Sequence, residues 1–463
     1  MKKILLGALV LVAAILVGLP GYLGSQVEQR YQAQVDQIKR AGFKVLDQRY
    51  ERGWFDAVAE TRLGLLLPTE LEAEMDEEVT FTIQSDIAHG PWLSAPFSGL
   101  AEINTRILVD DKSIFPEDYP AKINTLVAMD GSGETLIDFP KHMMEKEESK
   151  IDFGGLQGTV QFDSTFKEVD MQLTMPSVLI SEDNAQGFAI QGVRIDTRSR
   201  PGSSGLALGG GAVVVDSMTV EVPEGGKFEL AKLEIEAASS EQGEDKVSAG
   251  ATYRFQLLDL EGQQYGPAEM QITVDNLPTS VLLEIQKGME EIQANQSSIE
   301  QQQMAMMTML FSSGPEFIAS DPKLSINKLY LKTPEGEVKG DFSLQSVGLE
   351  WKDISNPAVI MERLQGAAQL TVPRAYLDKI LLERMTNELR TQELLALEQG
   401  AEPQDQASIE EQAKMLANMQ IDMMLGQGFL QQQDGMISAS AKLDGGQLTV
   451  NGKAIPLPVP GAQ

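Results

Sequence analysis

The chain has 463 residues, of which 68 are acidic and 37 are basic, so its formal net charge is -31. Recognition of phosphate backbones needs clustered Lys and Arg, and this charge balance excludes nucleic acid as a partner. The sequence has no cysteine, which excludes disulfides, thiolate nucleophiles and sulfur-bound metals. A chain of this length can form about two to four domains.

The N-terminus has the charge pattern of an export signal. Lys2 and Lys3 precede a nearly unbroken apolar run over residues 4–23, which is about the length that a helix needs to cross a hydrocarbon core. No clear cleavage site follows, so the pattern predicts a signal anchor, a transmembrane helix over residues 1–24, although small residues near its end leave cleavage open. The positive-inside rule places the lysines in the cytoplasm and the bulk of the chain beyond the membrane.

An amphipathic segment follows the apolar run. Val27, Tyr31, Val35 and Ile38 recur at helical spacing between charged residues. This periodicity predicts a juxtamembrane helix over residues 25–42.

The most distinctive short motif comprises Tyr50, Arg52, Gly53, Trp54 and Phe55. Glycine between a cation and two aromatic residues, in a strand context, is typical of a bulge or a tight turn. One interpretation of the motif is a cation–aromatic recognition site. The other, which the pattern favours, is a structural turn with Gly53 at positive φ, in which the Trp and Phe rings anchor the first sheet.

Residues 43–268 alternate polar and apolar side chains in short runs bounded by Gly, Pro, Asp and Asn. This pattern predicts an extended antiparallel β-rich body. His89 and His142 fall next to proline-containing turns, so they are expected in loops rather than at a metal. The predicted strands are 79–83, 103–109, 123–129, 158–162, 169–175, 188–195, 213–220, 233–237, 251–257 and 270–274.

The C-terminal part, residues 269–463, contains a diverged internal repeat. Residues 269–350 and 366–457 each predict a strand, a long helix and a hairpin. The apolar seam of the first helix predicts a length of about 45 Å. The expected fold class is therefore α+β, with an N-terminal transmembrane helix, an extended antiparallel β-rich body and a C-terminal pair of strand–long helix–hairpin repeats.

Several seam residues of the two long helices are methionines, namely Met289, Met306, Met419 and Met423. Methionine packs adaptably, and it recurs on surfaces that bind varied apolar partners. These residues are either core, packed on the sheet or a second helix, or the wall of a candidate apolar groove. The pattern favours core packing.

No common catalytic constellation occurs in the sequence. It has no P-loop, no dinucleotide-binding glycine pattern and no nucleophile elbow. Its acidic runs lack the alternating ligands of a calcium loop. We therefore expect no enzymatic activity, no metal and no cofactor.

Three features together resemble the YdgA-like family of bacterial envelope proteins, a domain family of unknown function. They are the N-terminal apolar segment, the cluster from Tyr50 to Phe55, and the C-terminal Gly446-Gln447-Leu448-Thr449-Val450-Asn451-Gly452-Lys453. The resemblance implies a Gram-negative protein held at the inner membrane through residues 4–23 as a single-pass protein with a periplasmic bulk. It brings no known catalytic residues.

These observations predict a non-enzymatic protein with a binding or scaffolding role in maintenance of the cell envelope. Two alternatives stay open: carriage of a lipid or another apolar ligand by a curved sheet and the Met-lined helices, and hydrolysis of an envelope polymer. The expected partners are the inner membrane, envelope proteins or lipid, and whether copies of the chain associate is left open.

Overall fold

A computed structural model describes residues 25, 27–28, 31–32, 43–65, 80–91, 93, 99–109, 119–146, 149–182, 185–221, 226–294, 299–398 and 405–455. Contacts divide the chain into two units, Met1–Val214 with Thr279–Gly314, and Val215–Pro278 with Pro315–Gln463. This division groups residues by contact, so it does not test the predicted segments 43–268 and 269–463.

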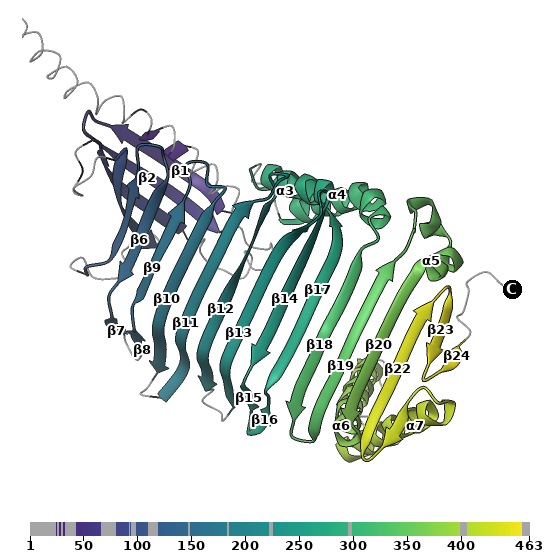
Figure 1. The fold of residues 1–463 in the computed structure, drawn as a ribbon. Coiled ribbons are helices and arrows are strands. Elements are labelled where there is room, and N and C mark those ends of the chain that lie inside the picture. The colour runs from purple at the N-terminus through teal and green to yellow at the C-terminus, as the bar shows by residue number, and fades with distance from the viewer. Residues whose placement is uncertain are drawn as a thin grey trace, which may run out of the picture. The chain divides into compact units, whose positions relative to one another are not determined.

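The expected α+β class with a transmembrane helix is wrong. The described chain is mostly antiparallel sheet, and its helices are insertions between strands (Figure 1). Within the described ranges, no helix is long and apolar enough to cross a membrane. The predicted segment 1–24 itself lies outside the described residues. The expectation separated a C-terminal pair of helix-containing repeats from the β-rich body, although the period-two pattern of strands continues around the helices.

The first unit is built on an antiparallel sheet in which β1, β2, β3, β4, β5, β6, β9, β10 and β11 pair in that order. β8 also pairs with β10, and β7 pairs with β8. The unit boundary falls within β12 (Ala207–Glu221). The strands are β1 (Phe43–Arg52), β2 (Asp56–Leu65), β3 (Thr80–His89), β4 (Ala101–Val109), β5 (Lys122–Val127), β6 (Gly133–Phe139), β7 (His142–Lys146), β8 (Ser149–Phe153), β9 (Leu156–Phe162), β10 (Val169–Glu182) and β11 (Ala185–Pro201).

In the core of the first unit, residues that precede β1 pack against the sheet. The five described residues between 25 and 42 are helical, and Val27 and Tyr31 among them are buried. The Tyr31 hydroxyl lies 2.6 Å from Thr61 Oγ1. Ala57 and Ala59 lie on the same face of β2 as Thr61 and leave room for the tyrosine ring, because they carry only a methyl group.

One long helix was expected after residue 278, but the chain forms two. Helix α3 (Thr279–Ala294) and helix α4 (Ile299–Ala319) lie antiparallel, since Ser313 near the end of α4 donates a hydrogen bond of 3.2 Å to Glu284 in α3. Met309 of α4 lies over Gly288 of α3. Folding back lets each short helix pack its apolar seam against the other, whereas a single straight helix has no such partner.

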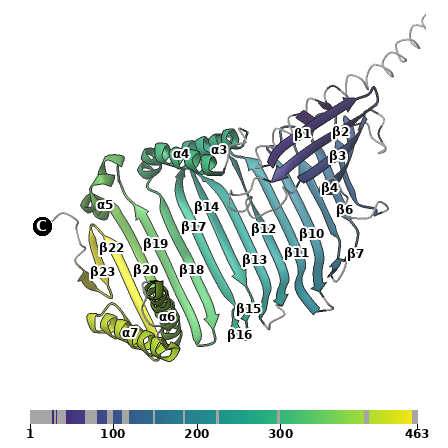
Figure 2. The ribbon, with the colours of Figure 1, turned by 180° about the vertical axis from the view of Figure 1, so that it is seen from behind.

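The second unit is also built on one antiparallel sheet, in which β13, β14, β17, β18, β19, β20, β22, β23 and β24 pair in that order (Figure 2). The strands are β13 (Lys227–Gln242), β14 (Lys246–Phe255), β15 (Leu257–Leu260), β16 (Gln263–Tyr265), β17 (Ala268–Pro278), β18 (Lys323–Thr333), β19 (Gly336–Ser346), β20 (Leu364–Pro373), β21 (Gln431–Gln433), β22 (Met436–Asp444), β23 (Gln447–Val450) and β24 (Lys453–Ile455). The helices are η1 (Trp351–Ser355), α5 (Pro357–Arg363), α6 (Arg374–Glu398) and α7 (Gln406–Gln427).

The same order of elements occurs twice along the chain. β17 leads into α3 and α4 and then into β18 and β19, and β20 leads into α6 and α7 and then into β22 and β23. In both places the strand after the helices pairs with the strand before them.

The C-terminal motif ties the last hairpin to the end of α7. Gly428, at φ 79°, ends the helix in the left-handed conformation, which glycine adopts without steric cost. Asn451 Nδ2 donates to the carbonyl oxygens of Gly428 and Phe429, at 3.1 and 3.0 Å. Its Oδ1 accepts from the Ser440 N–H at 2.9 Å. One side chain thus satisfies three backbone groups.

Asn451→Ala is expected to lower the free energy of unfolding by about 2–3 kcal/mol, because each lost hydrogen bond contributes about 1 kcal/mol. Urea unfolding of the full chain measures the change. Thr449→Ala, which removes one exposed side-chain hydrogen bond from the same hairpin, serves as the control and should change the value by less than about 1 kcal/mol. Equal changes in the two variants would contradict the role of Asn451.

Candidate functional site

Six neighbouring strands of the second unit, β14, β17, β18, β19, β20 and β22, carry a continuous apolar face. The register of the strands aligns their side chains in three rows that cross the sheet. Two of the eighteen residues are glycines, and apart from the hydroxyl group of Tyr253 the sixteen side chains are apolar. The rows are Tyr253, Met270, Leu329, Gly340, Leu370 and Ala439; Ala251, Ile272, Ile326, Phe342, Ala368 and Ala441; and Ala249, Val274, Leu324, Leu344, Gly366 and Leu443. We name these residues the apolar face.

The opposite side of the same strands is polar. One row on that side runs through Arg254, Glu269, Tyr330, Lys339, Thr371 and Ser438. The two sides differ because successive side chains of a strand point to opposite faces. A sheet with this pattern ordinarily buries its apolar side under a second layer.

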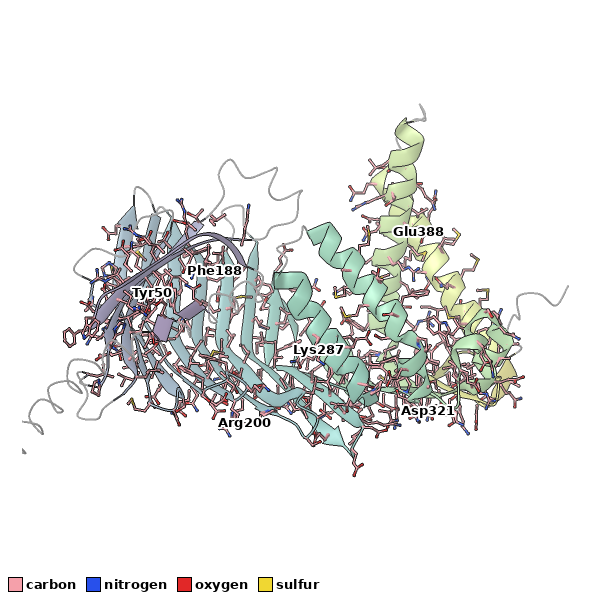
Figure 3. The ribbon with its side chains drawn as sticks, turned by 90° about the horizontal axis from the view of Figure 1, so that it is seen from above. Tyr50, Phe188, Arg200, Lys287, Asp321 and Glu388 are labelled. Atoms are coloured by element: carbon pink, nitrogen blue, oxygen red, sulfur yellow. The ribbon has the colours of Figure 1, made fainter. Side chains whose placement is uncertain are left out.

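The apolar face is not buried in this way. None of its residues is fully buried, and Leu324 and Leu370 are 41% and 43% exposed. The same side of the sheet is buried at the end that α6 and α7 cover. The buried residues there are Val338, Val372 and Ile437, each at most 9% exposed. Figure 3 shows α6, which carries Glu388, and α7 on one side of the sheet. The side chains that pack against this closed end are Leu331, Tyr376, Leu377, Leu425 and Leu430.

The dimensions of the apolar face follow from sheet geometry. Six strands spaced about 4.8 Å apart span about 24 Å, and three rows two residues apart span about 13 Å. The face therefore covers on the order of 300 Å². On a soluble monomer, contiguous apolar patches of this size are often functional.

A hollow on the polar side of the sheet contains Lys232, Arg254 and Lys328, yet its cations are already paired. The Arg254 guanidinium lies 2.9 Å from Glu236, and Lys232 Nζ lies 2.7 Å from Asp216. Lys328 pairs with Glu269, and this hydrogen bond is the largest of the effects that lower the pKa of that carboxyl. The hollow therefore offers no uncompensated charge to an anion.

The described methionines of the candidate apolar groove are exposed, contrary to the favoured interpretation of core packing. Met306 of α4 and Met419 and Met423 of α7 are all exposed. The side chain of Met289 lies outside the described residues. Helix α7 packs its opposite stripe instead, and the buried residues of that stripe are Ile409, Ala413, Ala417 and Ile421.

The motif around Gly53 forms the tip of the β1–β2 hairpin. Gly53, Trp54 and Phe55 connect the two strands, and the Gly53 N–H donates to the Asp56 carbonyl oxygen at 2.8 Å. Trp54 and Phe55 are 53% and 56% exposed, so they do not anchor the sheet. Gly53 is not at positive φ; a β-carbon there would instead lie 2.4 Å from Asp56 Oδ1.

Arg52 has a local ion-pair partner, and Tyr50 packs through its ring. Arg52 pairs with Glu28 at 2.9 Å rather than packing across a motif ring. The Tyr50 ring lies 5.3 Å from that of Tyr31, and burial, the largest effect, raises the pKa of Tyr50 to about 12. Tyr50 is therefore the motif residue that belongs to the core, and the Trp and Phe rings are its exposed part.

Trp54→Ala is expected to lower the free energy of unfolding by less than about 1 kcal/mol, because an exposed ring contributes little to stability. Tyr31→Ala is the matched comparison, since this ring is buried, and it should cost about 3–5 kcal/mol. Chemical denaturation of both variants measures the difference. A loss of about 3–5 kcal/mol for Trp54→Ala would restore the anchor interpretation.

Both histidines lie in strands, not in loops as expected. His89 ends β3 and is buried, and burial is the main cause that lowers its pKa. His142 begins β7, and its ring lies 5.0 Å from that of Tyr119. In the part of the chain that the structure describes, no three His, Asp or Glu side chains are grouped as metal ligands.

The comparisons with known proteins give a family but no characterised relative. No curated protein and no solved structure shows significant similarity to the chain. A family model described as "Bacterial protein of unknown function (DUF945)" matches residues 1–458. The chain therefore belongs to the DUF945 family of bacterial proteins.

Proposed function

We propose that this protein is a non-enzymatic lipid-binding protein of the bacterial cell envelope, and that the apolar face of the second unit holds an acyl chain. One observation carries the proposal: eighteen residues form a continuous apolar surface, and none of them is fully buried. Apolar surface removed from water contributes about 25 cal/mol per Å², so a ligand on this face gains a large driving force.

The composition of the face favours an acyl chain over a protein partner. Protein interfaces are enriched in aromatic residues, Met and Arg, whereas this face consists mainly of Leu, Ile, Val, Ala and Gly. An extended peptide laid across it would leave backbone amide groups without hydrogen-bond partners, which is unfavourable. An acyl chain has no such groups. The face, about 24 Å wide, also exceeds the length of one chain in a bilayer leaflet, which is about 15 Å.

We propose that the lipid-binding body of the protein lies in the periplasm. Lys2, Lys3 and the apolar residues 4–23 have the composition of an export signal, and the family is bacterial. We place the β-rich body in the periplasm, as the resemblance to YdgA-like proteins implies. A reporter that is active only in the periplasm, fused after Gln463, should be active in living cells. Activity of a cytoplasm-specific reporter at the same position would contradict this placement.

Scaffolding of other envelope proteins is the second candidate function. The observation that favours it is the exposed stripe of α7 formed by Met415, Met419 and Met423, which is separate from the stripe that α7 buries. Methionine-rich stripes adapt to varied partners. This candidate predicts that envelope proteins co-purify with the chain and that Met-stripe variants lose them.

Mass spectrometry of lipid retained by the purified full-length chain tests the lipid-binding proposal. We expect phospholipid or another acyl lipid to remain after washes that remove loosely associated lipid. A chain that carries no lipid after gentle purification, and takes up no labelled phospholipid afterwards, would contradict the proposal.

A further inference from the structure

The exposed tip of the β1–β2 hairpin is unusual for its pair of large aromatic rings. Trp54 and Phe55 are adjacent, and more than half of each side chain is open to solvent. Two backbone hydrogen bonds fix the conformation of the turn. The Gly53 N–H donates to the Asp56 carbonyl oxygen, and the His89 N–H of β3 donates to the Phe55 carbonyl oxygen at 2.8 Å. The tip is thus an ordered turn that exposes two aromatic rings to solvent.

The end of β1 beside the tip contacts the described helical residues that follow the apolar N-terminal sequence. Glu28 pairs with Arg52 at the end of β1, and Gln32 bonds to Gln48, farther from the tip, at 2.9 Å. The helical residues before β1 therefore approach the tip with their N-terminal end. The apolar run over residues 4–23 stops two residues before Ser25.

The charges around the tip are largely paired, although the chain as a whole is strongly acidic. Arg49 pairs with Glu51, and Arg52 pairs with Glu28. Asp56, at the start of β2, adds one further exposed carboxylate. Because two of these three carboxylates pair with arginine, a bilayer surface is repelled less at this point than it would be by three unpaired carboxylates. Trp and other aromatic rings favour the interface between lipid headgroups and hydrocarbon, where the apolar ring and any polar group are both accommodated.

We propose that Trp54 and Phe55 insert into the interfacial layer of a lipid bilayer and orient the first unit on the membrane surface. This contact is independent of the lipid-binding face of the second unit, so either proposal can fail without the other. The partner is the bilayer interface itself, with zwitterionic headgroups sufficient because the contact relies on the two aromatic rings and not on a cationic patch that would need anionic lipid.

Tryptophan fluorescence of the full-length chain in phosphatidylcholine liposomes tests the contact. The variant with Trp92→Phe and Trp351→Phe keeps Trp54 as its sole tryptophan, and the variant with Trp54→Phe and Trp92→Phe keeps Trp351 as the reference. We expect brominated phosphatidylcholine to quench most of the Trp54 emission and little of the Trp351 emission. Trp54 emission that aqueous acrylamide quenches fully, and brominated lipid does not, would overturn the proposal.

The absence of natural cysteines allows a second readout that leaves all tryptophans in place. Phe55→Cys and, as the control on a polar sheet surface, Gln365→Cys are each labelled with an environment-sensitive fluorophore. Reconstitution into liposomes should shift the emission of the Phe55 label to shorter wavelength and leave the Gln365 label unchanged. Equal emission at both positions would contradict insertion of the tip.

Discussion

Ile421→Ala is expected to lower the free energy of unfolding by about 2–5 kcal/mol, as for other large-to-small changes in a packed core. The Ile421 side chain is fully buried, on the stripe of α7 that also contains Ala413 and Ala417. Met419 lies two residues away and is 60% exposed. Met419→Ala should therefore change the value by less than about 0.5 kcal/mol.

Urea unfolding of both variants in the full chain separates the two stripes of α7. The pair is closely matched, because both positions lie in the same turn of one helix and both changes shorten an apolar side chain to alanine. A loss of several kcal/mol for Met419→Ala, or a negligible loss for Ile421→Ala, would contradict the assignment of buried and exposed stripes.

Leu324→Glu combined with Leu370→Glu is expected to leave the chain folded and to reduce retained lipid by about tenfold or more, which corresponds to about 1.4 kcal/mol or more of binding free energy. Both side chains are more than 40% exposed, so the carboxylates keep access to water in the free protein. A bound acyl chain would remove that water, and burying an unpaired carboxylate is costly.

Two controls define the effect of the double variant. Gln365→Glu adds a negative charge to the opposite, polar side of β20 and should leave lipid retention unchanged. Ile437→Glu places the charge at the closed end of the sheet, where the residue is 2% exposed, and should unfold the second unit. Circular dichroism checks the fold of each variant. A folded double variant that retains lipid as the parent chain does would contradict the proposed role of the face.

Each of the ten predicted strands overlaps an observed strand, because alternation records which face each side chain takes, but β2 and β6 to β8 were not among them. In β17, for example, Met270, Ile272 and Val274 alternate with Gln271 and Thr273, and the structure places the two sets on opposite sides. The apolar face itself was missed. Each of the six strands shows this same alternation in the sequence. Only the register between strands, which the sequence does not give, shows that the apolar residues form continuous rows.

The sequence could not distinguish an exposed apolar residue from a buried one. Met419 and Ile421 are both apolar and lie on the same helix, and which of them is buried depends on how α7 packs against α6. The same limit applies to Trp54, whose aromatic character suggested an anchor although the turn directs it to solvent. The two glycines are needed for different reasons. Gly428 adopts the left-handed conformation that ends α7, whereas Gly53 is needed because a β-carbon would collide with the Asp56 side chain.

Site-specific photo-crosslinking in living cells tests the lipid-binding account most directly. A photoreactive amino acid at Leu370 lies on the apolar face, and the same residue at Gln365 lies on the other side of the same strand. We expect mass spectrometry of the irradiated full-length chain to find a covalently attached acyl lipid at Leu370 and none at Gln365. Crosslinks from Leu370 to protein alone, or lipid adducts at equal yield from both positions, would contradict the lipid-binding account.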